Sequence, residues 1–170
     1  MDAASIQVYI PATLAMLQQL VADGSLLPVN GTAFAVTPTL REAYAQGDDD
    51  ELADVALREA ALASLRLLAA GEDQTVRPRR AVLAAEVDGA TFRPDLDDAV
   101  VRLAGPVPLD RVIAAYVDND AAEEAVAQAI EAIDAADLGD EDADLIVGDA
   151  QDHELAWYAN QELPFLLDLL

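Results

Sequence analysis

The chain has 170 residues, of which 54% are hydrophobic and 5% aromatic, and it contains no cysteine. This length suits one domain, residues 1–170, whose fold buries roughly 70% of the surface of the unfolded chain. The 33 acidic residues outnumber the 9 basic residues, all arginines, so the formal net charge is −24. Nucleic acids and anionic membrane surfaces are therefore expected to be poor partners, and the lack of cysteine excludes disulfides and thiol chemistry.

The sequence favours a cytoplasmic location. No apolar run approaches the ~20 residues of a membrane-spanning helix, and the first residues include Asp2 but no basic residue of the kind found in signal peptides. The acidity has three interpretations. The favoured one is genome bias together with solubility, which fits the alanine-rich composition and the use of arginine in place of lysine, and adaptation to high salt is a weaker alternative. The third is a DNA-like surface that binds a basic protein.

The first elements of the chain are a strand and a helix. Residues 6–10 form an apolar, β-branched run that predicts a strand. Pro11 suits the first position of a helix, and Gly24 is a good helix terminator. Asn30-Gly31 lies between two short apolar runs, so we expect a hairpin with a type I′ turn there.

The middle of the chain predicts one long helix and two strands. Asp48 and the acidic residues after it indicate the start of a helix that runs to about Ala70, because carboxylates cap helix N-termini. The apolar runs 81–87 and 112–117 predict strands. Asp118 and the two polar residues after it are expected to cap the next helix.

An aspartate-rich loop, residues 140–154, is expected before the last strand at 155–158 and a terminal helix that begins near Pro164. In order, the strong elements give β-α-(helical insert)-β-β-α-β. This is the order of a split βαβ unit. We therefore predict an α+β fold, a ferredoxin-like sandwich with additional helices.

The acidic loop contains the candidate metal or ligand residues Asp149, Asp152, His153 and Glu154. It begins like a calcium loop, but Leu145 occupies the position where the sharp turn needs glycine. Since the chain has one histidine, a zinc site would need carboxylates for all other protein ligands. Mg²⁺ or Mn²⁺ could be held by oxygen ligands alone. The favoured alternative is a solvated acidic loop with a surface histidine.

Other catalytic motifs are incomplete. The sequence has no lysine for a phosphate-binding loop, no G-x-G-x-x-G after a predicted strand, and no serine within G-x-S-x-G. Arg77, Arg79 and Arg80 form a basic cluster, which we expect to neutralise the domain's own carboxylates rather than bind an anion. We expect no cofactor, and a protein without enzymatic activity is favoured over an enzyme.

The C-terminal segment is strongly apolar and must cover the core or a second chain. Packing on its own core is favoured, and a homodimer contact is the alternative. Tryptophan and tyrosine just before this segment are residue types that anchor interfaces. The candidate interface residues are Trp157, Tyr158, Leu163, Phe165, Leu166 and Leu169.

Several segments are distinctive as a set: VYIPAT at 8–13, REAA at 58–61, RPDLDDAV at 93–100, GPVPLDR at 105–111 and ELAWY at 154–158. Together they resemble an uncharacterised actinobacterial protein family, a domain of unknown function. The resemblance implies a cytoplasmic actinobacterial protein and transfers no catalytic roles. Residues 1–5 resemble a short extension ahead of the family pattern.

Three functional hypotheses follow. The leading one is a non-enzymatic protein-interaction or regulatory domain, with a partner protein or a second copy of the chain as its ligand. The second is a carboxylate-based enzyme, assisted by Mg²⁺ or Mn²⁺, that uses the 140–154 acidic loop. The third is nucleic-acid mimicry, which needs a contiguous acidic stripe on the surface.

Overall fold

The computed structural model describes residues 5–71 and 77–169. At its centre is a seven-stranded antiparallel sheet with the strand order β5-β6-β3-β1-β4-β8-β9. A separate strand pair joins β2 to β7. The strands are β1 (Ile6–Ala12), β2 (Ser25–Leu26), β3 (Thr32–Phe34), β4 (Ala81–Val87), β5 (Thr91–Phe92), β6 (Val100–Arg102), β7 (Val107–Pro108), β8 (Val112–Val117) and β9 (Ala156–Ala159).

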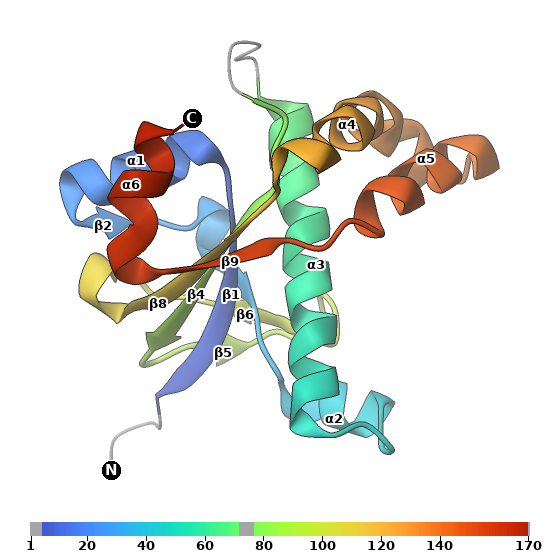
Figure 1. Cartoon of the computed structure of the whole chain (residues 1–170). Coiled ribbons are helices and arrows are strands. Elements are labelled where there is room, and N and C mark those ends of the chain that lie inside the picture. The colour runs from blue at the N-terminus through green and yellow to red at the C-terminus, as the bar shows by residue number, and fades with distance from the viewer. Residues whose placement is uncertain (1–4, 72–76, 170) are drawn as a thin grey trace.

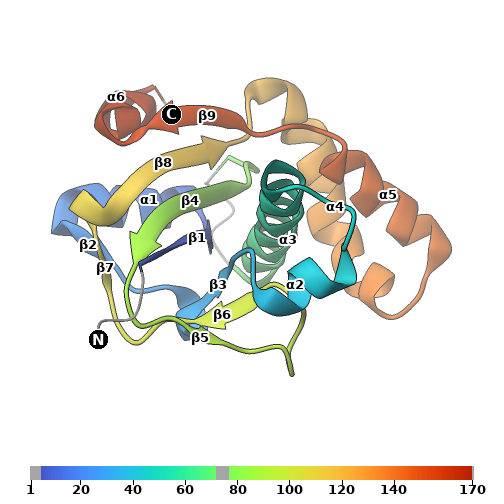
Figure 2. The same ribbon diagram turned by 90° about the horizontal axis from the view of Figure 1, so that it is seen from below.

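Helices cover both faces of the sheet (Figures 1 and 2). On one face lie α1 (Leu14–Asp23) and α6 (Leu163–Asp168), whose leucines join the apolar core of the strands. On the other face lies the long helix α3 (Asp49–Ala70), preceded by α2 (Pro38–Ala43). None of the helices in the described residues is long and apolar enough to cross a bilayer.

Helix α3 is buried on two sides. One side packs on the sheet, and Leu65 contacts the apolar cluster of α4 (Glu123–Asp137) and α5 (Glu141–Gln151). The start of α3 is fixed by Asp48, whose side chain accepts a hydrogen bond of 2.8 Å from the Glu51 backbone N–H. The predicted position of this helix is confirmed.

The α+β class is confirmed, and the predicted strands correspond to β1, β4, β8 and β9. These strands lie side by side in chain order. A ferredoxin-like sandwich would instead place the last of them beside the first. In the structure the other side of β1 is occupied by β3, through the pair Tyr9 and Phe34. The ferredoxin-like detail is therefore not confirmed.

The predicted start of the first helix is wrong. Pro11 lies within β1, where β3 no longer pairs with the strand, and a strand position without a neighbour on one side tolerates proline. Helix α1 begins directly after Thr13, because the Thr13 hydroxyl accepts a hydrogen bond from the Met16 backbone N–H. Gly24 ends α1 as predicted, with a φ of 77°.

The predicted hairpin is wrong in its pairing, although its turn residues behave as expected. Asn30 and Gly31 both have positive φ, 57° and 68°, as a type I′ turn requires. However, β2 pairs with β7, and β3 pairs with β1 and β6. Gly31 is required because an added Cβ would lie 2.9 Å from the Leu103 carbonyl oxygen.

The prediction of an aspartate-rich loop at 140–154 is wrong, because most of this segment forms α5. The Asp140 carboxylate accepts a hydrogen bond of 2.9 Å from the Ala143 backbone N–H and so caps the helix. The acidic residues that follow face the positive end of the helix dipole. Ala143, Val147 and Ala150 recur about one turn apart and are buried. On a helix, alternate aspartates point in different directions and do not face one ion.

Candidate functional site

A cavity of about 340 Å³ lies between α3, the sheet and the connection from α5 to β9. This volume falls at the lower end of ligand pockets, which measure roughly 300–1,000 Å³. We refer to it as the α3–β9 cavity. It is lined by Asp54, Leu57, Arg58, Ala61, Arg80, Tyr116, Gln151, Asp152, His153, Glu154 and Leu155.

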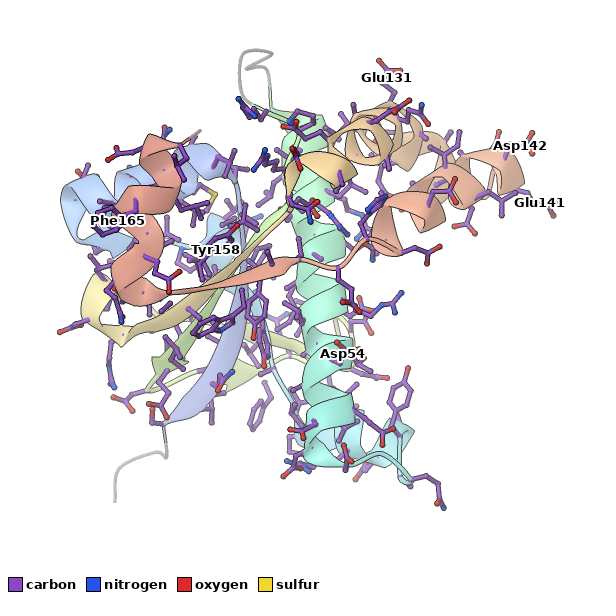
Figure 3. All side chains as sticks on the ribbon, in the orientation of Figure 1. Asp54, Glu131, Glu141, Asp142, Tyr158 and Phe165 are labelled. Carbon is purple, nitrogen blue, oxygen red and sulfur yellow. The ribbon has the colours of Figure 1, made fainter. Side chains whose placement is uncertain are left out.

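The helical side of the α3–β9 cavity follows from the residue spacing along α3. Asp54, Arg58 and Ala61 are about one turn apart, so the regular helix places them on one face. Asp54 and Arg58 are exposed, and Figure 3 shows Asp54 on α3 below the level of α5. One helix face therefore supplies a carboxylate and a guanidinium to the same cavity.

Arg80 fixes the sheet side of the cavity. Its side chain and that of Asp118 are 1% and 0% exposed, and two hydrogen bonds of 2.8 Å join Nε to Oδ2 and Nη2 to Oδ1. Nη2 also donates to the His153 carbonyl oxygen, and Nη1 donates to Oε1 of Gln151. The ion pair thereby ties the α5–β9 connection to the start of β4.

These contacts test two predictions about charged residues. The expectation that the basic cluster neutralises the domain's own carboxylates is confirmed, because Arg79 donates to Glu123 at 3.1 Å and Arg80 pairs with Asp118. The expectation that Asp118 caps the next helix is wrong. Its carboxylate is fully engaged by Arg80, including the Arg80 backbone N–H at 2.8 Å.

Several polar groups of the cavity have no hydrogen-bond partner within the described part of the chain. They are the Arg58 guanidinium, the Tyr116 hydroxyl, the His153 ring and one N–H on Nη1 of Arg80. Burial raises the pKa of Tyr116 above its ordinary value, so this hydroxyl stays protonated at neutral pH and can donate. The cavity thus combines donors from the sheet with carboxylates from α3 and from the connection.

Three of the four candidate metal or ligand residues line the α3–β9 cavity. Asp152, His153 and Glu154 lie in the connection after α5, whereas Asp149 is exposed on α5 and does not line the cavity. Across residues 5–71 and 77–169, no group of three or more acidic or histidine side chains is arranged to hold a metal ion. The geometry therefore gives no support to the Mg²⁺ or Mn²⁺ hypothesis.

The candidate interface residues separate into two surfaces and a buried set. Leu163 and Leu166 are buried in the core beneath α6, which confirms that the C-terminal segment packs on its own chain. Trp157 lies opposite Tyr116 in the neighbouring strand, while Tyr158 joins the core cluster on the α1 and α6 face. The remaining two candidates are exposed: Phe165 on α6, as Figure 3 shows, and Leu169 directly after that helix.

Sequence reasoning missed Asp54, Arg58 and Tyr116 as cavity residues. Asp54 and Arg58 lie four residues apart on a recognised helix, which is a signal for a shared helix face but not for what packs opposite that face. Tyr116 was recognised only as part of a strand. The missing information was the non-local pairing of β8 with β9, which brings the connection over α3.

Comparison with known proteins assigns a family but no activity. A family model described as a family of unknown function, DUF6912, matches residues 6–167. The chain belongs to this family. The predicted membership in a family of unknown function is thus confirmed, and its actinobacterial origin stays a prediction. No curated protein and no solved structure matches the chain significantly.

Proposed function

We propose that the protein is a non-enzymatic interaction domain that binds an extended, basic segment of a partner protein along the outer edge of β9. The supporting observation is that β9 ends the sheet beyond β8 (Figure 2), and within the described residues no strand pairs with its other edge. The unpaired backbone groups of an edge strand are a template for a further strand.

Trp157 supplies an anchor beside that edge. Its side chain is 56% exposed in the middle of β9. Aromatic side chains of this kind carry much of the binding energy of protein interfaces. A segment paired with β9 would direct alternate side chains to the face that carries Trp157. Backbone pairing would then supply affinity, and the surroundings of Trp157 would select the side chains.

Charge favours a basic partner over a second copy of the chain. With a net charge of −24, two copies repel each other, and pairing through β9 would bring Asp152 and Glu154 of both copies toward one edge. A basic segment is attracted instead, which raises its association rate. The predicted protein partner is therefore retained, and the homodimer becomes an outcome of the test.

The test uses a fluorescein-labelled peptide of alternating valine and threonine with one central arginine, and measures its binding by fluorescence anisotropy. We expect saturable binding that Trp157→Ala weakens about ten-fold, as loss of an interface aromatic does. Binding should also protect β9 amides from hydrogen exchange. Phe165→Ala is the matched control, because Phe165 is 72% exposed but lies on α6 (Figure 3), and its loss should leave binding unchanged.

Two outcomes contradict the proposal. Peptide binding that is insensitive to Trp157→Ala, or that leaves β9 amides unprotected, would exclude the β9 edge. The second outcome comes from analytical sedimentation of the unlabelled protein. If the wild type forms a two-chain species and the Trp157→Ala variant does not, the ligand of β9 is a second copy of the chain and not a partner protein.

A further inference from the structure

The α3–β9 cavity adjoins the edge where the partner segment is proposed to bind. Leu155 lines the cavity, and the next residue, Ala156, begins β9. Tyr116 also lines the cavity and is the register partner of Trp157. Alternate side chains of a strand point to the same face. A segment paired with β9 would therefore have one side chain within reach of this cavity.

The cavity has an excess of negative charge. Asp54 from α3 and both Asp152 and Glu154 from the connection are exposed carboxylates at its surface. The charge of Arg80 is matched by buried Asp118. Among the lining residues, Arg58 is then the one cation without an ion-pair partner in the described ranges. Three carboxylates against one such guanidinium favour a cationic group in the ligand.

The sheet side of the cavity offers donors instead. Arg80 is 1% exposed and lines the cavity, yet one N–H on its Nη1 lacks a partner in the described part of the chain. A ligand that supplies an acceptor can take a hydrogen bond from this N–H, in addition to the bond that Nη1 donates to Gln151. The Tyr116 hydroxyl and the exposed Arg58 guanidinium provide further donors nearby. A ligand for this cavity should therefore combine an acceptor with a cation.

A basic amino-acid residue within a peptide has this combination, since its backbone carbonyl accepts hydrogen bonds and its side chain is cationic. We infer that the α3–β9 cavity is a specificity pocket for an arginine or lysine residue of the segment that binds β9. Because the carbonyls of a paired strand lie in the plane of the sheet, that residue lies just beyond the paired stretch, at the Leu155 end of β9. There its carbonyl faces Arg80 and Tyr116, and its charged group lies among Asp54, Asp152 and Glu154. This inference rests on the proposed function and adds the side chain that the domain selects.

The experiment titrates isotope-labelled protein with N-acetyl-arginine methylamide and follows backbone amide shifts by NMR. This probe contains the side chain and two amide carbonyls but is too short to form a strand. The uncharged citrulline analogue of the same shape is the control probe. We expect saturable shifts at 54, 58, 116 and 152–155 with the arginine probe, and about ten-fold weaker binding of the citrulline probe.

Matched variants separate the cavity from general attraction to an acidic protein. The cavity variant combines Asp54→Asn, Asp152→Asn and Glu154→Gln. The control variant removes the same number of charges from the distant parts of α4 and α5 seen in Figure 3, and combines Glu131→Gln, Glu141→Gln and Asp142→Asn. The cavity variant should bind the arginine probe about ten-fold more weakly, while the control variant should bind it as the wild type does.

Equal binding of the two probes, or equal effects of the two variants, would overturn the inference and indicate diffuse charge attraction. The result is separable from the test of the proposed function. If the arginine probe binds at the cavity but the labelled peptide does not protect the β9 amides from hydrogen exchange, the proposed strand addition is excluded and the proposed pocket is supported. If the labelled peptide protects the β9 amides equally in the wild type and in the cavity variant, the proposed pocket is excluded and the proposed strand addition is supported.

Discussion

At the scale of single residues, the ion pair of Arg80 and Asp118 organises the site. Both side chains are buried, and desolvating two charges costs more than their attraction returns unless hydrogen bonds satisfy them. Here Asp118 accepts from the Arg80 backbone and guanidinium, and the guanidinium also donates to Gln151 and His153. The pair therefore fixes the α5–β9 connection, which forms one wall of the cavity, as well as the adjoining ends of β4 and β8 in the sheet.

Breaking this pair should strongly destabilise the fold. We expect Asp118→Ala to lower the free energy of unfolding by about 3–5 kcal/mol, because Arg80 is left buried without its counter-ion. Asp118→Asn keeps an acceptor for Arg80 and should cost less. Urea denaturation followed by circular dichroism measures both variants. The control is Asp95→Ala, which removes an exposed partner of Arg93 and should leave the free energy of unfolding almost unchanged. Equal losses for Asp118→Ala and Asp95→Ala would contradict the argument.

At the scale of elements, α3 is joined to the sheet by a polar contact within the apolar core. Ser64 is fully buried, and its hydroxyl donates to the Ala12 carbonyl oxygen at 2.7 Å. The same hydroxyl accepts from the Ala81 backbone N–H at 3.0 Å. Ala12 and Ala81 are register partners at the ends of β1 and β4. The Ser64 hydroxyl therefore bridges the backbones of β1 and β4 and links both strands to α3.

Ser64→Ala should lower the free energy of unfolding by about 1–3 kcal/mol, because the Ala81 N–H and the Ala12 carbonyl lose a buried partner. Ser25→Ala is a suitable control, since the Ser25 hydroxyl makes no hydrogen bond within the described residues, and should change stability by about 0.5 kcal/mol or less. Chemical denaturation of the two variants under the same conditions tests this. A loss in Ser64→Ala no larger than in Ser25→Ala would show that the bridge contributes nothing.

The sequence predicted elements well where local patterns determine them. The runs at 81–87 and 112–117 are apolar except for the exposed Glu86, and they match β4 and β8 residue for residue. Asp48 and Gly24 marked helix ends through capping, which is also local. Helix α5 was missed because its acidic residues suggested a loop, while its buried positions are mostly small alanines.

Pairing and cavity formation could not be predicted in the same way. Asn30-Gly31 adopts the expected turn, but the strands beside it pair elsewhere, because non-local packing outweighs the turn preference. The α3–β9 cavity is lined by residues from α3, by the residue before β4, and by residues from β8, the end of α5 and the α5–β9 connection. No spacing within one segment reveals such a site. Arg80 illustrates the limit: its cluster was correctly expected to bind carboxylates, but its partner Asp118 was assigned to a helix cap.

At the scale of the whole molecule, charge is the dominant feature. The 9 arginines leave 24 acidic charges uncompensated, and several arginines are already committed to pairs within the fold, including Arg66 with Asp137 and Arg111 with Asp88. Most of the remaining carboxylates are exposed, as on the outer ends of α4 and α5 (Figure 3). The same surplus that would attract a basic segment must therefore oppose the compact state.

This repulsion predicts that sodium chloride raises the melting temperature. Between about 0.01 M and about 0.15 M salt the Debye length falls from about 30 Å to about 8 Å, so repulsion between separated carboxylates is screened. The same salt weakens the exposed ion pairs, but carboxylates outnumber arginines 33 to 9, so the repulsion that salt relieves exceeds the attraction that it weakens. Calorimetry across this range should show a rising melting temperature. The variant that combines Glu131→Gln, Glu141→Gln and Asp142→Asn should show a shallower rise, because it carries fewer uncompensated charges. A melting temperature of the wild type that stays constant or falls with salt would contradict this prediction. It would mean that the acidic residues are far enough apart that their repulsion does not limit stability.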